Sequence, residues 1–541
     1  MPNETGHSDR QSSGDVAAPR ITNPIFFIRG VEPREEIDLV KPVANAIELL
    51  DKHLLPATFL LQYDALIDER FTSLARSLDS RHNVGVWLEV VQPLAERAGL
   101  KWRGRWSWDW ESHVDMLVGY APEDRMRMLD IIMAEFRGVF GHYPESVGSW
   151  VLDAVTLGYL EDRYGVVAAC VCKDQCGTDG YTLWGGYWNQ AYYPSRSNAL
   201  MPAQDESRQI SIPVFRMLGS DPIYQYDHAL GSAEQGVVSL EPVYPHAGGC
   251  REWVDWFFAV NFESPCLAFA YTQTGQENSF GWDSMATGLT YQLGQLARLR
   301  EEKGVRVETL ADSGKWFRQR FLLTPATAVT ALTDPRGANH RSVWYNSRFY
   351  RTNLFWENDR LRIRDIHIFD QRYQERYLEE TCKGPLSIYD TLPIMDGYNW
   401  STPGELAGIR LVRLADGDCN PLIGGIPNVS ETSSTELSVS WPLLTGGCLE
   451  IVCREDSLEV SLTDPSDWAL DMSWSNDKLI DLVDVTDRSM SYRHEGFTYG
   501  VKCSVGQLRQ REGRSVLMLP DSGRIVLDLN SAGCSGAGPG S

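Results

Sequence analysis

The sequence predicts an α/β fold in which a distorted (β/α)7–8 barrel is followed by a C-terminal all-β sandwich domain. The sequence patterns of two regions of the chain predict this fold. From residue 24 to about residue 321, short apolar runs alternate with helical patterns, which is typical of βαβ units in a parallel sheet. After about residue 322, short β-rich segments are separated by Gly, Pro, Asp and Asn, which is typical of a sandwich. We expect a disordered N-terminus (1–20), a barrel catalytic domain (21–321), one or two β-sandwiches (322–530) and a flexible tail (531–541).

The first half of the barrel is predicted as four strand–helix units. Each begins with an apolar run that is short enough for a buried strand and continues into a helical pattern. A long Trp-rich insertion separates the third strand from its helix. In chain order, the predicted strands and helices are Ile25–Ile28 with Asp38–Leu50, Thr58–Leu61 with Asp68–Leu78, Val84–Leu88 with Asp124–Phe140, and Val147–Val151 with Val155–Tyr164.

The second half of the barrel begins with the strand Val166–Val171, which leads into a long polar and aromatic loop. Three further units follow: Ile210–Phe215 with Gly249–Asn261, Leu267–Tyr271 with Ser284–Lys303, and Val305–Thr309 with Ser313–Phe321. Seven or eight units in one stretch of this length indicate a closed or nearly closed barrel. The sandwich strands are predicted at Ser342–Tyr345, Arg360–Ile368, Leu437–Trp441, Cys448–Cys453, Leu458–Thr463, Phe497–Ser504 and Arg524–Leu529.

The charge balance restricts the classes of partner. The 541 residues include 50 Lys and Arg against 73 Asp and Glu, a formal net charge of −23. Nucleic acids and anionic membranes bind basic faces, so we expect neither as a partner. No secretory signal and no apolar stretch of membrane-spanning length is visible, and we therefore expect a cytoplasmic protein. A homo-oligomer is possible.

Acidic, amide and aromatic side chains follow the predicted strands, where an α/β barrel builds its binding site. A glycosidase needs one protonated and one ionised carboxyl group beside the bond that it cleaves. We expect an oligo- or polysaccharide substrate, with these candidates: catalytic Asp153, Glu277 and Glu89; substrate-binding Arg29, Glu32, Trp150, Asp174, Trp188, Tyr192, Gln276 and Trp282.

Structural alternatives exist for several of these candidates. Asp153 directly precedes a predicted helix and could be its N-cap. The aromatic loop from Asp174 to Arg196 suits a site that stacks on sugars, but it could equally be a lid over the barrel mouth. The clustered Trp residues could serve packing as well as binding.

Common cofactor motifs are absent from the sequence. The histidines show no HxH, HExxH or HxxxH spacing, and the eleven cysteines include no CxxC pair, so no zinc or redox site is predicted. No GxGxxG after a strand, P-loop or GxSxG is present, so nucleotide cofactors and serine hydrolysis have no support. We expect no cofactor and no metal.

Two segments carry a resemblance to a known superfamily. Pro56-Ala-Thr-Phe-Leu-Leu61 is similar to the second strand, and Val305–Asp312 with its Trp-containing helix to the closing strand, of the polysaccharide deacetylase (NodB-like) barrels. In layout the chain resembles the related glycoside hydrolase families 57 and 38. The resemblance covers residues 24–321 and implies a distorted (β/α)7 barrel with a C-terminal β-sandwich.

The resemblance also implies the positions of site residues, but this chain differs from the family motifs at some of them. The deacetylases have paired Asp residues after strand one and an HxxxH-type motif after strand three, where this chain has Arg29-Gly-Val-Glu32 and Trp87-Leu-Glu89. Family 57 works without metal and carries catalytic carboxylates after its fourth and seventh strands. By strand order, those positions hold Asp153 and Glu277, with the residue types swapped.

From these features we predict a metal-independent glycoside hydrolase that acts through a carboxylate pair. Two alternatives are a metal-dependent carbohydrate deacetylase and a non-catalytic glycan-binding protein.

Overall fold

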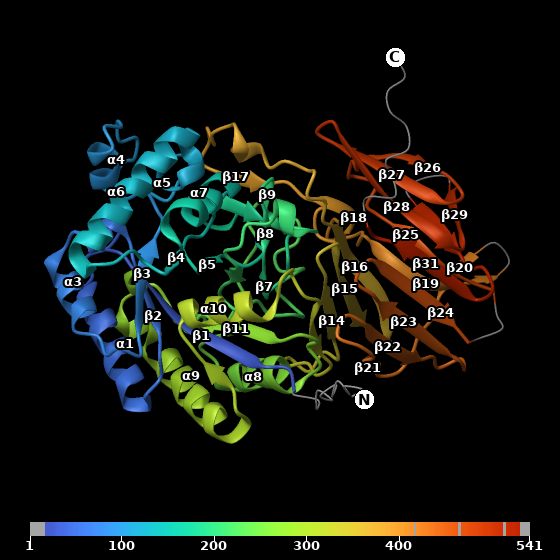
Figure 1. Cartoon of the computed structure of the whole chain (residues 1–541). Coiled ribbons are helices and arrows are strands. Elements are labelled where there is room, and N and C mark those ends of the chain that lie inside the picture. The colour runs from blue at the N-terminus through green and yellow to red at the C-terminus, as the bar shows by residue number, and fades with distance from the viewer. Residues whose placement is uncertain (1–16, 416–417, 464–466, 512–514, 531–541) are drawn as a thin grey trace, which may run out of the picture.

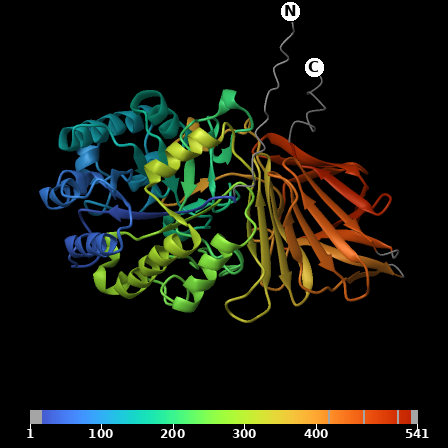
Figure 2. The same cartoon turned by 60° about the horizontal axis from the view of Figure 1, so that its bottom comes forward.

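The computed structural model describes residues 17–415, 418–463, 467–511 and 515–530. An α/β barrel, coloured from blue to yellow-green, lies beside an all-β domain coloured from yellow to red (Figure 1). In the turned view the long helices gather on one side and the strands of the second domain on the other (Figure 2). The predicted fold class is confirmed. The flexible tail and most of the predicted disordered N-terminus lie outside the described residues, and Arg20 already belongs to the first strand.

The barrel is built on one strongly curved sheet whose strands run parallel, with one short antiparallel strand at an edge. Its order is β11-β1-β2-β3-β4-β5-β10-β7, and β12 pairs with β1. The strands are β1 (Arg20–Ile28), β2 (Thr58–Leu61), β3 (Asn83–Trp87), β4 (Ser146–Gly148), β5 (Ala168–Val171), β7 (Ala191–Tyr192), β10 (Val214–Arg216), β11 (Ala270–Thr274) and β12 (Arg306–Val307).

Helices cover the outside of this sheet (Figure 1). Their apolar faces pack on the strands in one continuous core. The helices are α1 (Val40–His53), α2 (Tyr63–Leu66), α3 (Glu69–Arg76), α4 (Gln92–Arg97), α5 (Ser112–Asp115), α6 (Pro122–Phe140), α7 (Ala154–Tyr164), α8 (Arg251–Glu263), α9 (Trp282–Lys303) and α10 (Leu310–Arg320). Short 3-10 turns lie at η1 (Leu117–Gly119), η2 (Thr178–Gly180), η3 (Glu206–Arg208), η4 (Asn278–Phe280) and η5 (Arg376–Leu378).

The barrel is open between β10 and β11, which are not paired. Two glutamine side chains satisfy backbone groups at this seam. The Tyr271 amide donates to Gln190 Oε1 at 2.8 Å, and the Leu218 amide donates to Gln273 Oε1 at 2.8 Å. Unpaired backbone groups at a buried edge are costly, so these amides hold the seam together without strand pairing.

The second domain is one sandwich of two antiparallel sheets rather than two consecutive sandwiches, because the chain crosses between the two sheets several times. The first sheet contains β13 (Thr327–Ala331), β14 (Arg341–Asn346), β15 (Tyr350–Glu357), β16 (Arg360–Ile368), β18 (Leu392–Asp396), β19 (Gly408–Ala415), β20 (Asp418–Pro421), β25 (Trp468–Ser473), β29 (Gln507–Arg511) and β30 (Ser515–Leu519). The second contains β21 (Asn428–Glu431), β22 (Leu437–Pro442), β23 (Cys448–Cys453), β24 (Ser457–Leu462), β26 (Leu482–Val485), β27 (Ser489–His494), β28 (Phe497–Val505) and β31 (Arg524–Asp528).

A segment between β16 and β18 leaves the sandwich and packs on the barrel. Its strand β17 (Ser387–Tyr389) pairs in parallel with β6 (Tyr181–Leu183), which follows β5 of the barrel. Its backbone also accepts a hydrogen bond from Ser112 at the Pro385 carbonyl (3.0 Å). A further small ladder joins β8 (Pro194–Ser195) to β9 (Asn198–Pro202). The second domain therefore contributes directly to the surface around the barrel mouth.

Candidate active site

A cavity of about 870 Å³ opens at the carboxyl ends of the barrel strands. This volume is within the range of small-molecule sites, about 300–1,000 Å³. Its walls come from the loop after β1, the Trp-rich insertion after β3, the loops after β4 and β5, the long connection before α8, the turn after β11 and the segment between β16 and β18. The lining residues fall in 29–35, 89, 108–116, 150, 175–180, 218, 233–244, 277–280 and 385–386.

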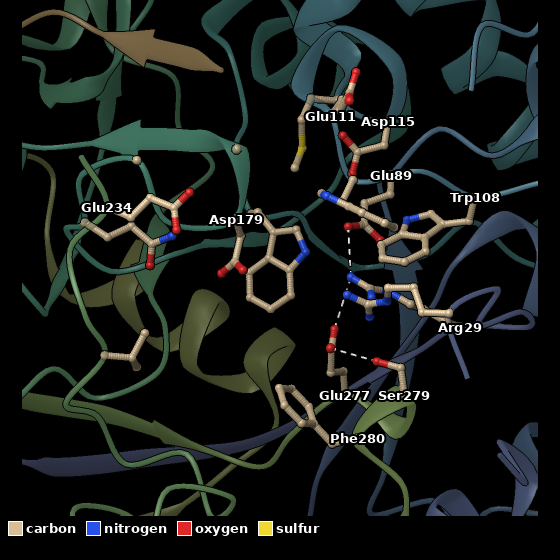
Figure 3. A pocket seen from close by; sticks show the side chains of 18 of the residues that line it. Arg29, Glu89, Trp108, Glu111, Asp115, Asp179, Glu234, Glu277, Ser279 and Phe280 are labelled. Atoms are coloured by element: carbon tan, nitrogen blue, oxygen red, sulfur yellow. Dashed lines mark hydrogen bonds and ion pairs between the residues drawn. The ribbon is translucent and has the colours of Figure 1, made fainter. Parts of the chain in front are cut away.

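Arg29 lies at the centre of one wall. It directly follows β1, and its side chain is 4% exposed. Its Nη2 lies 3.1 Å from Glu89 Oε1 and 3.1 Å from Glu277 Oε2, and its guanidinium group stacks 4.0 Å from the Trp108 ring. Figure 3 shows the three charged side chains as one chain of contacts. Burial alone would lower the pKa of Arg29, but Glu277 and Glu89 raise it, so the group is a permanent cation.

Glu277 is placed by the turn that follows β11. Gly275 has φ 110°, and a Cβ there would lie 2.0 Å from the Ile25 carbonyl oxygen, so only glycine lets the chain cross so close to β1. One carboxylate oxygen, Oε1, accepts from Ser279 Oγ at 2.7 Å. The other, Oε2, faces Arg29 without hydrogen-bond geometry and has no hydrogen-bond partner in the described chain. Glu277 is therefore held in the cavity wall by Ser279 at one carboxylate oxygen and by Arg29 at the other.

Glu89 and Asp115 form a buried acidic pair behind Arg29, each 1% exposed. Glu89 Oε2 accepts from Gln62 Nε2 at 2.6 Å. Burial raises the pKa of Glu89, with Arg29 opposing and Glu277 reinforcing the shift. Burial, together with the charge of Glu89, raises the pKa of Asp115 well above its ordinary range. Asp115 is therefore the member of the pair that keeps its proton. Glu89 is in contact with a cation and ionises more easily.

Two carboxylates lie on the opposite side of the cavity. Figure 3 shows Asp179 and Glu234 facing Arg29, Glu89 and Glu277 across the opening. Asp179 comes from the loop after β5 and has a left-handed backbone with φ 55°. It is exposed to the water of the cavity, yet the enclosing walls remove part of its hydration. Partial burial and the charge of Glu277 both raise its pKa.

Aromatic faces complete the cavity. Trp150 follows β4 and packs edge-on against Trp87 with ring centroids 4.9 Å apart, which leaves it held by the core while it lines the opening. Trp108 and Trp110 come from the insertion after β3, and Tyr244 and Phe280 from the opposite loops. Arg34 lies over both indoles of the insertion, 5.0 Å from Trp108 and 5.2 Å from Trp110. Rings beside carboxylates are what a pyranose needs for stacking and hydrogen bonding.

Some of the residues predicted from the sequence meet at this cavity. Arg29, Glu32, Glu89, Trp150 and Glu277 all line it. Gln276 stands behind it, because its Oε1 accepts from the Glu277 amide at 2.8 Å and its Nε2 donates to the cavity residue Glu241 at 3.1 Å.

Asp153 is not brought together with Glu277. It is fully buried, and its Oδ1 accepts from the Thr156 amide at 2.9 Å as the N-cap of α7. The same oxygen also accepts from Arg125 Nη1 at 3.1 Å. The capping alternative describes its geometry, and the assignment of Asp153 as a catalytic residue is therefore withdrawn.

The aromatic loop after β5 also lies elsewhere than predicted, since much of it packs against the sandwich. Asp174 pairs with Arg216 at 2.6 Å and with Arg351 of β15. The Trp188 ring stacks on Trp344 of β14 at 4.2 Å. Tyr192 is buried and donates to the Ala199 carbonyl at 2.7 Å. Trp282 begins α9 and packs on the core outside the cavity.

The sequence reasoning missed six carboxylates that line the cavity: Glu35, Glu111, Asp115, Asp179, Glu234 and Glu241. None of them follows a strand directly. Their only sequence signal was position in long polar and aromatic insertions, which indicate function without indicating the residue.

The metal ion used by deacetylases of this superfamily does not fit the residues present. Arg29, a cation, contacts both Glu89 and Glu277, and no histidine lines the cavity. In the described part of the chain, the one group of three ligand-type side chains close enough for a metal is Asp390, His494 and Glu495, on the far domain. Arg376 already pairs with Asp390 and Glu495 there.

No protein-family model and no curated protein matches the sequence. Among solved structures, a protein from Parabacteroides distasonis that is provisionally named a glycoside hydrolase/deacetylase has 14% identity and a TM-score of 0.54, over 69% of this chain and 90% of that chain. A protein from Mycobacterium smegmatis, provisionally named a polysaccharide deacetylase, has 13% identity and a TM-score of 0.36, over 57% and 93%.

The likeness to the Parabacteroides distasonis protein shows the fold. The chain has the fold of the NodB-like barrel superfamily, and the predicted resemblance is confirmed at that level. The two likenesses do not test the finer resemblance to glycoside hydrolase families 57 and 38. In the described residues, no helix is both long and apolar enough to cross a membrane.

Proposed function

We propose that the chain is a carbohydrate-processing enzyme and that it hydrolyses glycosidic bonds at this cavity. The observation that carries the proposal is the pair of opposed carboxylates. Glu277, beside a permanent cation, lies on one side, and Asp179, whose pKa is raised, lies on the other. Environments that favour ionisation of one carboxylate and protonation of another are what glycoside hydrolysis requires.

In the proposed mechanism, Asp179 protonates the leaving glycosidic oxygen. The Glu277 carboxylate attacks the anomeric carbon or activates a water molecule. Glu89 is unsuited to flank the same bond together with Glu277, because Arg29 lies between them. We therefore assign Glu89 the role of holding Arg29, and Arg29 the role of holding the Glu277 carboxylate in place. Trp150 would stack on the sugar.

The experiment is a reducing-end assay over a panel of oligo- and polysaccharides. Glu277→Gln should lower kcat by about 10²–10⁴-fold while thermal unfolding stays near that of the wild type. Glu301→Gln is the matched control, because Glu301 is an exposed residue of α9 with a 74% exposed side chain. Turnover of Glu277→Gln close to that of the control would remove Glu277 from the mechanism.

A deacetylase is the second candidate, since the name of the Parabacteroides distasonis protein covers both activities. The same panel separates the two reactions, because a hydrolase releases reducing ends and a deacetylase releases acetate. Acetate release that a chelator abolishes would support the deacetylase. Sugar binding with neither product would indicate a glycan-binding protein.

A further inference from the structure

The cavity carries far more negative charge than positive charge. Nine carboxylates line it, from Glu32, Glu35, Glu89, Glu111, Asp115, Asp179, Glu234, Glu241 and Glu277, against the guanidinium groups of Arg29 and Arg34. Arg34 is paired with Glu32, and Arg29 is shared by Glu89 and Glu277. Both cations are therefore occupied, and the surplus is negative.

Several of these carboxylates have no cationic partner in the described chain. Within the described chain, Asp179, Glu234 and Glu35 form no ion pair, and Glu241 is held by Ser239 Oγ at 2.6 Å and Gln276 Nε2 at 3.1 Å. Burial raises the pKa of Glu241 and of Asp179, and the buried Lys173 opposes this shift without pairing with either carboxylate. Glu35 and Glu234 are exposed to solvent, but Glu241 is only 6% exposed, and a carboxylate in a partly dry site is costly. Their gathering in one cavity indicates that a ligand supplies the positive charge.

Asp115 gives a second, independent indication. It is 1% exposed, it lines the cavity, and its Oδ1 has no hydrogen-bond partner in the described chain. An unsatisfied buried oxygen costs about 1–3 kcal/mol unless a group from outside satisfies it. An ammonium group has three donors and no acceptor, so it can donate to this oxygen and favour the loss of the Asp115 proton.

A bare metal ion explains this arrangement less well than an organic cation does. A metal needs several ligand atoms converging on one point, and the cavity carboxylates of the described chain form no such group. They are instead distributed around a space that is also lined by Trp108, Trp150 and Tyr244. Aromatic faces attract both sugar rings and cations.

We propose that the substrate is a glycan whose sugars carry free, protonated amino groups, such as an oligomer of glucosamine. This inference rests on the proposed function for the reaction, but its binding component can be tested alone. N-acetylated sugars lack the charge, and uronic acids would be repelled by the carboxylates. The ammonium groups would lie among Asp115, Glu234 and Glu241, away from the proton that Asp179 supplies to the leaving oxygen.

The test compares three oligomers of equal length by calorimetry: glucosamine, N-acetylglucosamine and galacturonic acid. The wild-type chain should bind the glucosamine oligomer at least about tenfold more tightly than the acetylated one, and this preference should shrink with added salt. Binding should release protons, measured as a dependence of the heat on the buffer, because a bound ammonium group lowers the raised pKa of Asp115.

Two variants sharpen the result. Asp115→Asn resembles the protonated acid in shape, so it should fold and should reduce proton release. Glu234→Gln should weaken the preference for the amino oligomer, whereas Glu301→Gln on α9 should not. Equal or tighter binding of the acetylated or acidic oligomer, or no binding of the amino oligomer, overturns the inference.

Product analysis of the same mixtures separates this inference from the proposed function. Tight, selective binding of the amino oligomer without cleavage supports the inference while it contradicts the hydrolase. Preferred cleavage of a neutral glycan overturns the inference and leaves the hydrolase intact.

Discussion

Arg29 organises the candidate site, because one buried cation serves two carboxylates that would otherwise repel each other. The contacts of 3.1 Å to Glu89 and Glu277, and the stacking on Trp108, leave it little freedom. Such an arrangement holds the carboxylate that we propose to be catalytic in place before substrate arrives, and preorganised charges are usually the largest electrostatic contribution to catalysis.

Removing Arg29 should therefore harm stability and activity together. We expect Arg29→Met to lower the free energy of unfolding by about 3–5 kcal/mol at neutral pH, since it leaves uncompensated buried carboxylates. Urea denaturation measures this loss. The double variant Arg29→Met/Glu89→Gln should recover part of the stability, because it removes one of the buried carboxylates that lost its cation. Additive losses in the double variant would show that Arg29 and Glu89 are not coupled.

Asp179 should set the alkaline limit of activity, because a general acid must keep its proton. Asp179→Asn should lower kcat by about 10²–10⁴-fold on natural glycans and flatten the alkaline limb of the pH–rate profile. On aryl glycosides with acidic leaving groups the loss should be small, since their leaving oxygen needs no proton. An unchanged alkaline limb, or an equal loss on both substrate types, would contradict this role.

At the scale of residues, sequence reasoning worked where the strand itself positions the side chain. Arg29 directly follows β1, Glu89 is the second residue after β3, and Glu277 is the third residue after β11. Asp115 and Asp179 could not be chosen, because long insertions bring them to the cavity through tertiary contacts. Asp153 follows a strand too, but at the start of a helix, where capping and catalysis have the same sequence signature.

At the scale of elements, the predicted strands and helices lie close to those observed, because apolar runs and helical periodicity are local signals. The first strand is the main exception, since β1 begins at Arg20 rather than Ile25. Its early residues are polar but buried. Asn23 Nδ2, for example, donates to Ser313 Oγ at 2.8 Å and to the Glu308 carbonyl at 2.9 Å. A buried polar residue satisfied by a distant element does not show in a local apolar pattern.

The turn after β11 is the element on which the position of Glu277 depends. Gly275→Ala should lower the free energy of unfolding by more than about 1–3 kcal/mol, because the residue has φ 110° and its Cβ would meet the Ile25 carbonyl oxygen at 2.0 Å. It should also lower kcat, since Glu277 moves with the turn. Gly294→Ala is the matched control.

Gly294 lies within α9, where an added Cβ meets nothing within 4 Å. There, alanine should stabilise the helix by about 0.5–1 kcal/mol. Thermal unfolding and reducing-end assays on both variants measure the contrast. If both glycines behave alike, the conformation of the turn is not what positions Glu277.

At the scale of the whole molecule, the barrel and the sandwich share a buried ionic network. Asp174 at the end of β5 pairs with Arg216 and with Arg351 of β15, and Arg351 pairs with Asp365 of β16 at 2.8 Å. All four side chains are buried. The sequence does not reveal such a network, because its members lie far apart along the chain. It explains why much of the loop that was predicted to bind sugar joins the two domains, although residues 175–180 of the same loop line the cavity.

A second link between the domains should make stability depend on pH. His494 of β27 lies between two carboxylates, with Nδ1 2.7 Å from Asp481 Oδ2 and Nε2 3.3 Å from Asp390 Oδ1. Asp390 directly follows β17, the strand that pairs with β6 of the barrel. Hydrogen bonding to Asp390, opposed by burial and reinforced by Asp481, raises the pKa of His494 from 6.5 to about 9.

A histidine whose pKa is raised on folding stabilises the protein fully below its unfolded pKa, and this contribution disappears as pH rises through the folded value. The pairing should therefore stabilise the chain below pH 6.5 and be lost between pH 6.5 and about 9. In that window, the Tm of the wild type should fall more steeply with pH than the Tm of His494→Gln. Replacing the exposed His142 by Gln should leave the slope unchanged. Equal slopes for the wild type and His494→Gln would show that protonated His494 does not fasten the barrel-contacting segment to the second sheet.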